Sequence, residues 1–387
     1  MRITAVDTVV VNARLRNWVF VKVTTDEPGL VGWGEASLEW KTRAVVGAVD
    51  DLADIVVGED PMRIEHLWQA MFRQQFFKGG IVTMSAISGI DQALHDVKAK
   101  ALGVPLYELL GGRVRDRVRL YDHLGGGDST AVYDEATPEA FAERARASVA
   151  DGFTALKILA VPPSRPLEGA AAVRQAESLM GAVRDAVGDD VDVMVDLHGR
   201  TTPAAAIQFG HALAPYRPWF LEEPVQPGNV DALVEVARAL PIPIATGERL
   251  VTRWEFREVL EKRACAVIQP DVCHCGGVAE LRRIAAHAET CFVSVAPHNP
   301  LGPIATAVNV HVALSMPNFL IQEVMRSDVP WRDEVVDAPL EIADGHVLPP
   351  IRPGIGVEVD EEAAARYPYA PELPARVFYD DGAVGDW

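Results

Sequence analysis

Residues 192–198, Asp-Val-Met-Val-Asp-Leu-His, form a short apolar run that ends in a carboxylate and an imidazole. Two runs of the same kind follow, Trp-Phe-Leu-Glu-Glu at 219–223 and Ile-Pro-Ile-Ala-Thr-Gly-Glu at 242–248. Amphipathic stretches of about 10–20 residues separate such runs, which is typical of repeated βα units and a parallel sheet. The second half of the chain is therefore predicted to be an α/β structure.

Eight apolar runs of this type follow one another, and we predict each to be a strand. Eight parallel strands with short crossovers close into a (β/α)8-type barrel. A doubly wound open sheet is the alternative, but no GxGxxG sequence follows the first strand and no Walker motif occurs in the chain. The predicted strands are 118–123, 154–160, 192–198, 219–223, 242–248, 266–271, 292–298 and 319–324.

The N-terminal part of the chain has a different pattern. Residues 1–35 alternate apolar and polar side chains as a hairpin does, and helical periodicity then covers 43–57, 62–75 and 83–102. We predict an α+β domain over residues 1–117, with a polar loop at 12–18 that exposes Trp18. The barrel would then span 118–330, and the segment 331–387 would pack back on the N-terminal domain.

Composition excludes several classes of protein. Hydrophobic residues make up 49% of the 387 residues, enough for a large core. The 55 acidic and 36 basic residues give a net charge of −19, so nucleic acids and anionic membranes are poor partners. We find no signal-peptide pattern and no apolar window of about 18 residues, which predicts a soluble cytoplasmic protein.

The four cysteines lie in the second half of the chain and do not form a secreted disulfide framework. Cys273-His274-Cys275 lacks the second ligand pair that a zinc site needs. We interpret these thiols as reduced structural residues.

Polar residues end most of the predicted strands, at the edge where barrel active sites lie. Glu222 follows Asp196 by 26 residues and Glu248 follows Glu222 by 26, so three carboxylates are expected at one height on neighbouring strands. Unrelated surface acids would not show this equal spacing. Converging carboxylates repel one another unless a cation lies between them, and an oxygen-only site suits Mg2+. We predict one Mg2+ per active site.

Two histidines are expected beside these carboxylates. His198 lies two residues after Asp196, so strand alternation predicts both side chains on the inward face. His298 ends the seventh strand and Asp271 ends the sixth, 27 residues earlier, so the two should be in contact. A carboxylate that fixes the tautomer of an imidazole and raises its basicity makes a general base.

The chain resembles the mandelate racemase/muconate lactonizing enzyme branch of the enolase superfamily over nearly its whole length. His198, two residues after the first carboxylate, and the ending Asp-Gly-Ala-Val-Gly-Asp-Trp are similar to the D-galactonate dehydratases. The matching segments are 32–35 (Gly-Trp-Gly-Glu), 85–94, 110–112, 195–200, 221–224, 247–250, 268–271, 296–303 and 353–357.

The resemblance implies a (β/α)7β barrel with an α+β capping domain that the C-terminal segment completes. It implies that Asp196, Glu222 and Glu248 hold Mg2+ and that His298 abstracts the C2 proton of an aldonate to give an ene-diolate. His198 would protonate the leaving 3-hydroxyl, so the product would be a 2-keto-3-deoxy acid. Lys157, and Glu323 in its protonated form, would donate to the substrate carboxylate.

Two departures from the family pattern bear on the reaction and its substrate. Racemases of the branch carry Lys-x-Lys on the second barrel strand, whereas this chain has Lys157-Ile158-Leu159, which argues against two-base racemisation. Leu159 also differs from the polar residue expected in a galactonate dehydratase. A sugar-acid cycloisomerase is the alternative enzyme, and a non-catalytic sugar-binding protein is the alternative from another class.

Specificity is expected to lie in the capping domain, where loops near 12–18 and 75–80 would form a lid that excludes water. We expect a homo-oligomer, from dimer to octamer. The predicted substrate-binding residues are Arg14, Trp18, Lys78, Asp122, His123 and Arg200.

Overall fold

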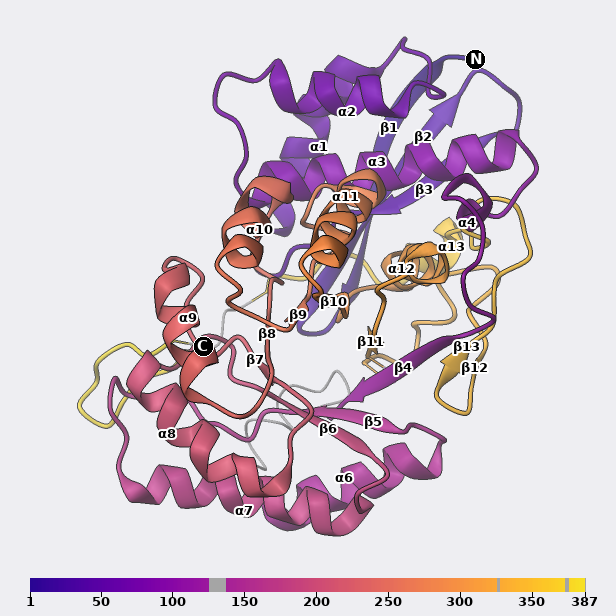
Figure 1. The fold of residues 1–387 in the computed structure, drawn as a ribbon. Helices are drawn as coiled ribbons and strands as arrows, with labels where there is room; N and C mark the ends of the chain where they lie inside the picture. The colour runs from indigo at the N-terminus through magenta and orange to yellow at the C-terminus, as the bar shows by residue number, and fades with distance from the viewer. Residues whose placement is uncertain (125–136, 326–327, 373–375, 387) are drawn as a thin grey trace.

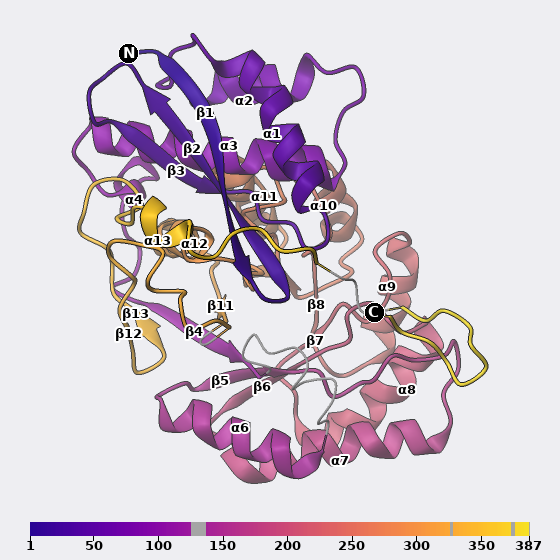
Figure 2. The same cartoon turned by 180° about the vertical axis from the view of Figure 1, so that it is seen from behind.

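The computed structural model describes residues 1–124, 137–325, 328–372 and 376–386. The N-terminal part contains a three-stranded antiparallel sheet in the order β1-β2-β3, with three helices beside it (Figures 1 and 2). The strands are β1 (Ile3–Ala13), β2 (Arg16–Thr25) and β3 (Val31–Glu35), and the helices are α1 (Thr42–Val56), α2 (Ile64–Arg73) and α3 (Ile81–Ala101).

Helix α3 lies against β3 because glycines leave room for it. A Cβ atom on Gly32 would lie 2.2 Å from the carbonyl oxygen of Ala93, and one on Gly34 would lie 2.0 Å from that of Gly89. Any larger residue in these two positions would push the helix away from the sheet. Helix α3 is buried on most of its sides because it also packs against α11 of the barrel.

The short helix α4 (Leu106–Leu109) leads into the barrel, whose strands are parallel and hydrogen-bonded in sequence order from β4 to β10. The ring closes because β11 pairs with β4, and a bridge joins Val295 of β10 to Phe319, just before β11. The strands are β4 (Val118–His123), β5 (Ala155–Ile158), β6 (Asp192–Asp196), β7 (Leu221–Glu222), β8 (Ile244–Thr246), β9 (Val267–Ile268), β10 (Ser294–Val295) and β11 (Gln322–Val324).

Helices cover the outside of the barrel (Figure 1). Helix α6 begins at Pro138, as its sequence predicts, because the Thr137 hydroxyl accepts a hydrogen bond from the amide of Ala140 and Pro fits the first turn. The helices are α6 (Pro138–Ala150), α7 (Ala170–Val187), α8 (Pro203–Leu213) with the 3-10 turn η1 (Ala214–Tyr216), α9 (Val230–Ala239), α10 (Thr252–Glu261), α11 (Gly277–Thr290) and α12 (Pro303–Ser315).

After β11 the described chain forms a hairpin of β12 (Ile342–Ala343) and β13 (His346–Val347), and later the short helix α13 (Glu361–Ala364). Strand β13 pairs antiparallel with β4, so this segment extends the barrel sheet. It then reaches the N-terminal hairpin. There the side-chain amide of Asn17 donates to the Ala370 carbonyl at 2.9 Å, and the backbone amide of Asn12 donates to the Tyr367 carbonyl at 2.8 Å.

The predicted loop at 12–18 is wrong, because β1 and β2 continue almost to the tip of their hairpin. Trp18 is fully buried rather than exposed. Strand alternation places its ring on the same face as Phe20, 6.1 Å away between ring centroids, and the Arg332 guanidinium lies over it at 5.0 Å. The tip itself is a short turn at Arg14 and Leu15.

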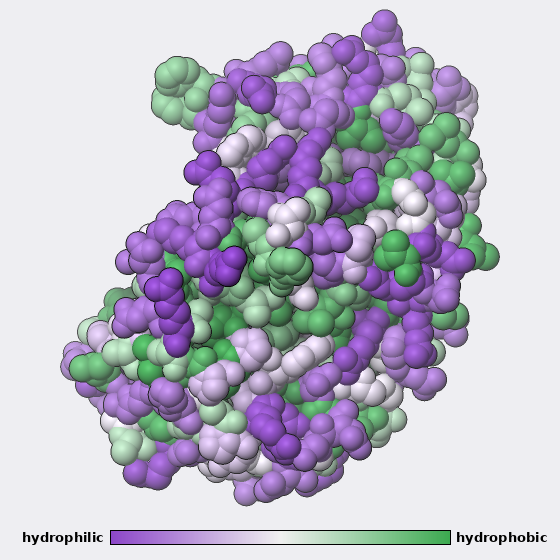
Figure 3. Space-filling model, in the orientation of Figure 1, coloured by the Kyte–Doolittle hydropathy of each residue, from purple (hydrophilic) through white to green (hydrophobic). Residues whose placement is uncertain are grey.

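The outline of the molecule is indented between the capping domain and the barrel, on the left side of Figure 3. The face in view mixes hydrophilic residues with small apolar patches. Among the residues that the structure describes, none of the helices combines the length and the apolar character that crossing a membrane requires.

Candidate active site

The three predicted metal ligands converge. Asp196 ends β6 and Glu222 ends β7 in register with it, while Glu248 follows β8 by two residues. One carboxylate oxygen of each residue lies within 4.8 Å of the others. The second oxygen of Glu222, Oε2, is buried and has no hydrogen-bond partner among the described residues. An unsatisfied buried carboxylate oxygen beside two further carboxylates fits a hard divalent cation such as Mg2+.

Lys157 of β5 supplies a positive charge to this cluster. Its Nζ donates to Glu222 Oε1 at 2.7 Å and to Glu323 Oε1 at 2.8 Å, and lies 3.4 Å from Asp196 Oδ2. Burial opposes its charge, but these carboxylates raise the pKa of Lys157 well above its usual value. Lys157 is therefore a fixed cation in contact with Asp196, Glu222 and Glu323.

The surroundings of Glu323 favour its ionised form, whereas the predicted donor role needs the protonated form. Burial alone would raise its pKa, but Lys157 and His298 lower the pKa of Glu323 to about 2. Its Oε2 accepts a hydrogen bond from the backbone amide of Asn299 at 2.8 Å. Glu323 thus orients Lys157 and the segment after β10.

The predicted pair of His298 and Asp271 is in contact, with Nδ1 2.7 Å from Asp271 Oδ2. Asp271 Oδ1 accepts from the amide of Cys273 at 2.6 Å, and His298 Nε2 lies 3.5 Å from Glu248 Oε2. Burial lowers the pKa of His298, but Glu248 and Asp271 outweigh it and bring the pKa to about 10. Nε2 of the imidazole thus faces the carboxylate cluster, and Asp271 holds Nδ1.

His198 also meets the cluster, although strand alternation is not the reason. Strand β6 ends at Asp196, and His198 adopts a left-handed backbone conformation with φ of 49°. Its backbone amide donates to Asp196 Oδ1 at 2.8 Å, and this turn brings Nε2 to 3.2 Å from Asp196 Oδ2. Arg200 is buried, with Nη2 3.1 Å from His198 Nδ1 and Nη1 3.2 Å from the Val161 carbonyl oxygen.

The first barrel strand contributes one of its two predicted residues. His123 is close enough to Lys157 for their charges to interact, and burial together with Lys157 lowers the pKa of His123 to about 3. Asp122 points the other way and accepts a hydrogen bond from Ser148 of α6. Adjacent strand residues face opposite sides of the sheet, so Asp122 lies outside the barrel wall and the prediction that it lines the sugar pocket is wrong.

The remaining predicted substrate contacts are not brought into the cluster. Arg14, in the hairpin turn, lies 5.7 Å from the ring of Trp331, and Trp18 is in the core. Lys78 is exposed in the segment between α2 and α3. Arg16 is the hairpin residue that reaches the barrel, because its guanidinium donates to the Pro300 carbonyl oxygen, two residues after His298.

Sequence reasoning missed two buried acids that support the site. Glu223 accepts from the Thr246 hydroxyl at 2.6 Å and from Arg249 Nε at 2.7 Å, so it braces the turn before Glu248. Glu35 of β3 accepts from the amides of Gly302 and Ala305, each at 2.8 Å, and holds the start of α12. The motifs Glu-Glu-Pro and Gly-Trp-Gly-Glu mark these residues in the sequence but do not give their partners.

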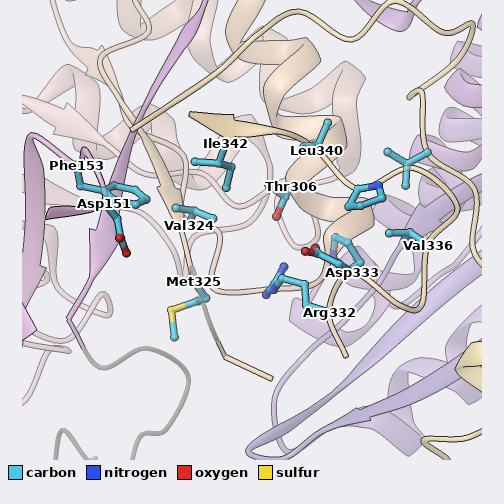
Figure 4. Close-up of a pocket in the computed structure, with 13 residues that line it drawn as sticks. Asp151, Phe153, Thr306, Val324, Met325, Arg332, Asp333, Val336, Leu340 and Ile342 are labelled. Atoms are coloured by element: carbon cyan, nitrogen blue, oxygen red, sulfur yellow. The ribbon is translucent and has the colours of Figure 1, made fainter. Parts of the chain in front are cut away.

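A cavity of about 460 Å3 lies elsewhere, between β11, α12 and the C-terminal segment. Thr306, Arg332 and Asp333 surround it together with apolar residues (Figure 4). Val324 faces it while the neighbouring Glu323 faces the barrel interior, so the cavity is on the other side of the barrel wall from the carboxylates.

Comparisons with known proteins agree with this architecture. D-galactonate dehydratase of Ralstonia nicotianae is 41% identical over 378 residues, 96% of each chain, and that of Pectobacterium atrosepticum is 39% identical over 395 residues, 100% of each chain.

A crystal structure of an enolase superfamily member from Salmonella typhimurium superposes with a TM-score of 0.89 at 36% identity, covering 95% of this chain and 98% of that one. An enolase from Agrobacterium radiobacter, solved with sodium and L-malate bound, gives a TM-score of 0.88 at 36% identity with both chains fully covered.

Two family descriptions match most of the chain. Residues 3–111 match the mandelate racemase/muconate lactonizing enzyme N-terminal domain, and residues 140–363 match the enolase C-terminal domain-like family. The chain belongs to the mandelate racemase/muconate lactonizing enzyme branch of the enolase superfamily.

Proposed function

We propose that the protein catalyses the Mg2+-dependent dehydration of an aldonate, with D-galactonate as the first candidate, to a 2-keto-3-deoxy acid. Full-length similarity to D-galactonate dehydratases makes the chain a hydro-lyase that acts on an acid sugar. The observation that carries the mechanism is the arrangement of two histidines on either side of one carboxylate cluster, His298 3.5 Å from Glu248 and His198 3.2 Å from Asp196.

The residues that would hold Mg2+ are Asp196, Glu222 and Glu248. When bound, the ion would accept the substrate carboxylate and neutralise the negative charge that develops on it during proton abstraction. Lys157 already lies at the base of this cluster and would keep its carboxylates oriented.

His298 is the base in this proposal. Asp271 accepts a hydrogen bond from Nδ1, so the nitrogen that can take a proton is Nε2, which faces the cluster. A substrate carboxylate held at the cluster would place its neighbouring carbon, C2, next to Nε2. The negative charge of Glu248 raises the pKa of His298, and a cation at the cluster would offset that charge and leave His298 neutral. Neutral His298 then takes the C2 proton, and Asp271 stabilises the imidazolium that results.

His198 is the acid. Its Nε2 faces the same cluster from β6, whereas His298 reaches it from the end of β10. A proton from His198 Nε2 to the 3-hydroxyl would release water, after which the enol product tautomerises to the 2-keto-3-deoxy acid. Two different histidines thus remove the proton and assist the leaving hydroxyl, which is the division of roles that an elimination needs.

The substrate is tested by a screen of purified protein with Mg2+ against aldonates and aldarates, read with semicarbazide, which reacts with 2-keto acids. We expect an EDTA-sensitive signal with D-galactonate or a close stereoisomer. A signal with another acid sugar would keep the reaction and change the substrate, and His123 and Leu159 would be the residues to examine first. Tight Mg2+-independent binding of an acid sugar without turnover would contradict the proposal.

A further inference from the structure

Another histidine, His274, is buried behind the proposed base, in the Cys273-His274-Cys275 sequence that carries no metal motif. His274 Nε2 is 3.6 Å from Asp271 Oδ2, the oxygen that also contacts His298 Nδ1. Its Nδ1 lies 2.9 Å from the hydroxyl of Ser85, in helix α3 of the capping domain. His274 therefore connects the capping domain to the carboxylate that orients the base.

Hydrogen bonding indicates which nitrogen of His274 carries the proton. The Ser85 hydroxyl has one proton, and its two neighbours are His274 Nδ1 and the Ile81 carbonyl oxygen, 2.8 Å away. If the hydroxyl donates to Ile81, a neutral His274 would have to donate from Nδ1 and turn the lone pair of Nε2 toward Asp271. That arrangement is repulsive, so we assign the proton to Nε2, where it faces the Asp271 carboxylate.

The contact has an effect on the dyad. An N–H group that faces Asp271 Oδ2 attracts this oxygen and holds the carboxylate in the orientation in which it accepts from His298 Nδ1. At 3.6 Å the contact is too long for a hydrogen bond, so it limits the rotation of the carboxylate without displacing His298 from it.

Helix α3 contacts the segment 272–276, which contains His274, through three side chains about one helical turn apart. Besides Ser85, the Ser88 hydroxyl accepts from the amide of Gly276 at 2.9 Å, and the Gln92 amide donates to the Val272 carbonyl at 3.1 Å. The segment that carries His274 is thus fixed by the capping domain and not by the barrel alone.

We propose that His274 is a positioning residue for the His298–Asp271 pair, held by Ser85 of the capping domain with its Nε2 proton directed at Asp271. The inference rests on the proposed function, because it assigns His298 the role of base. It gives the capping domain a part in proton abstraction that is separate from covering the substrate.

The test compares two variants of similar length. His274→Gln keeps an N–H donor close to the position of Nε2, whereas His274→Met fills similar space without a donor. The readout is the rate of C2 hydrogen exchange in D2O, with kcat, KM and the Mg2+ concentration for half activity measured beside it. His211→Met, on the exposed end of α8, is the matched control for replacing a histidine with methionine.

We expect His274→Met to lower C2 exchange and kcat by about tenfold or more, with KM and the Mg2+ requirement unchanged. His274→Gln should remain within about threefold of the wild type in both rates, a range set by retention of the donor. Equal losses in the two variants would mean that His274 only fills space, and wild-type exchange in His274→Met would overturn the proposal directly. Should His274→Met fail to fold, Ser85→Ala is the second variant, and it must slow exchange while leaving KM unchanged.

A measurement without turnover separates this inference from the proposed function. In protein labelled with 15N-histidine, NMR should show His274 protonated on Nε2, and the Nδ1 proton signal of His298 should shift in His274→Met. If the wild type exchanges no C2 hydrogen of any acid sugar, the proposed function fails and these signals alone decide the positioning role. An Nδ1-protonated His274, or an unmoved His298 signal, would refute it.

Discussion

The Arg200 guanidinium lies 3.1 Å from His198 Nδ1, and this contact decides where the imidazole carries its proton. Arginine has only donors, so Nδ1 must accept and a neutral His198 is protonated on Nε2. Nε2 is the nitrogen that lies 3.2 Å from Asp196 Oδ2. The nitrogen that faces the carboxylate cluster therefore carries a proton, and it is the imidazolium form of His198 that would release this proton to the leaving hydroxyl, because a neutral imidazole is too weak an acid.

Replacing the acid should separate the two halves of the reaction. In His198→Asn, elimination should fall by about a hundredfold or more because the leaving hydroxyl receives no proton, whereas His298 still removes the C2 proton. NMR in D2O should then show deuterium entering C2 of unreacted substrate without 2-keto acid. Loss of both exchange and elimination would contradict the acid role of His198.

Removing the charge of the orienting carboxylate should affect both halves together. In Asp271→Asn the amide can donate to His298 Nδ1 and select the wrong tautomer, so C2 exchange and kcat should fall by about a hundredfold or more. The Mg2+ requirement should stay the same, since Asp271 is outside the predicted ligand set. Exchange at the wild-type rate would show that His298 does not depend on Asp271.

Metal binding can be measured without substrate. Mg2+ at about 100 times its Kd should stabilise the fold by about 2.7 kcal/mol, because it binds the folded site and not the unfolded chain. Glu222→Gln should abolish the corresponding rise in Tm, since it removes a charge from the centre of the cluster. Glu258→Gln, an exposed change on α10, is the control and should keep the full shift. An equal shift in Glu222→Gln would place the ion elsewhere.

Glu35 should make stability depend on pH. Burial raises the pKa of Glu35 to about 7, although Ser37 and the amides of Ala305 and Gly302 favour its ionised form. The folded state therefore binds this proton more tightly than the unfolded state, whose ordinary value is 4.5. The contribution is complete below about pH 4.5 and is lost as the pH rises through 7, a decrease of about 3 kcal/mol.

Urea unfolding in EDTA at several pH values between 5 and 8 checks this sign. Glu35→Gln should have a lower free energy of unfolding at pH 5, because it loses an acceptor at the start of α12, but a flatter dependence on pH. Asp96, with a pKa raised to about 6 by burial, should contribute a similar slope to both proteins. If the two proteins show parallel curves, Glu35 is not the titrating group.

The sequence predicts the barrel and the cluster well because both depend on a period. Between Asp196 and Glu248 one βα unit recurs every 26 residues, and that spacing brings Asp196, Glu222 and Glu248 to one edge. The pairing of Asp271 with His298 follows from the same rule applied to the next two strands. Strand ends are less predictable: β6 stops at Asp196, and the side chain of His198 reaches the cluster from a left-handed turn.

Predictions failed where the outcome depends on contacts distant in sequence. Trp18 follows the polar residues Arg16 and Asn17 and looks like a loop residue, but its ring is covered by Arg332, more than 300 residues later in the chain. Asp122 was misplaced because a strand with polar residues on both faces does not show which face is inside; Ser148 of α6 supplies the answer. Glu35 and Ser85 belong to the capping domain, and their partners are likewise distant in sequence because they lie in the barrel.

The pairing of β4 with β11 also matters during synthesis on the ribosome. Leu120 can pair with Gln322 and close the ring only after 202 more residues have been synthesised. Asn17 likewise cannot bind Ala370 until nearly the whole chain has been made. Until then the nascent chain exposes strand edges and apolar surface of the kind that chaperones bind. A chain cut after Val324 would retain every proposed catalytic residue, yet it would lack a segment that contacts both the first hairpin and the barrel. We expect such a chain to accumulate in aggregates when it is expressed.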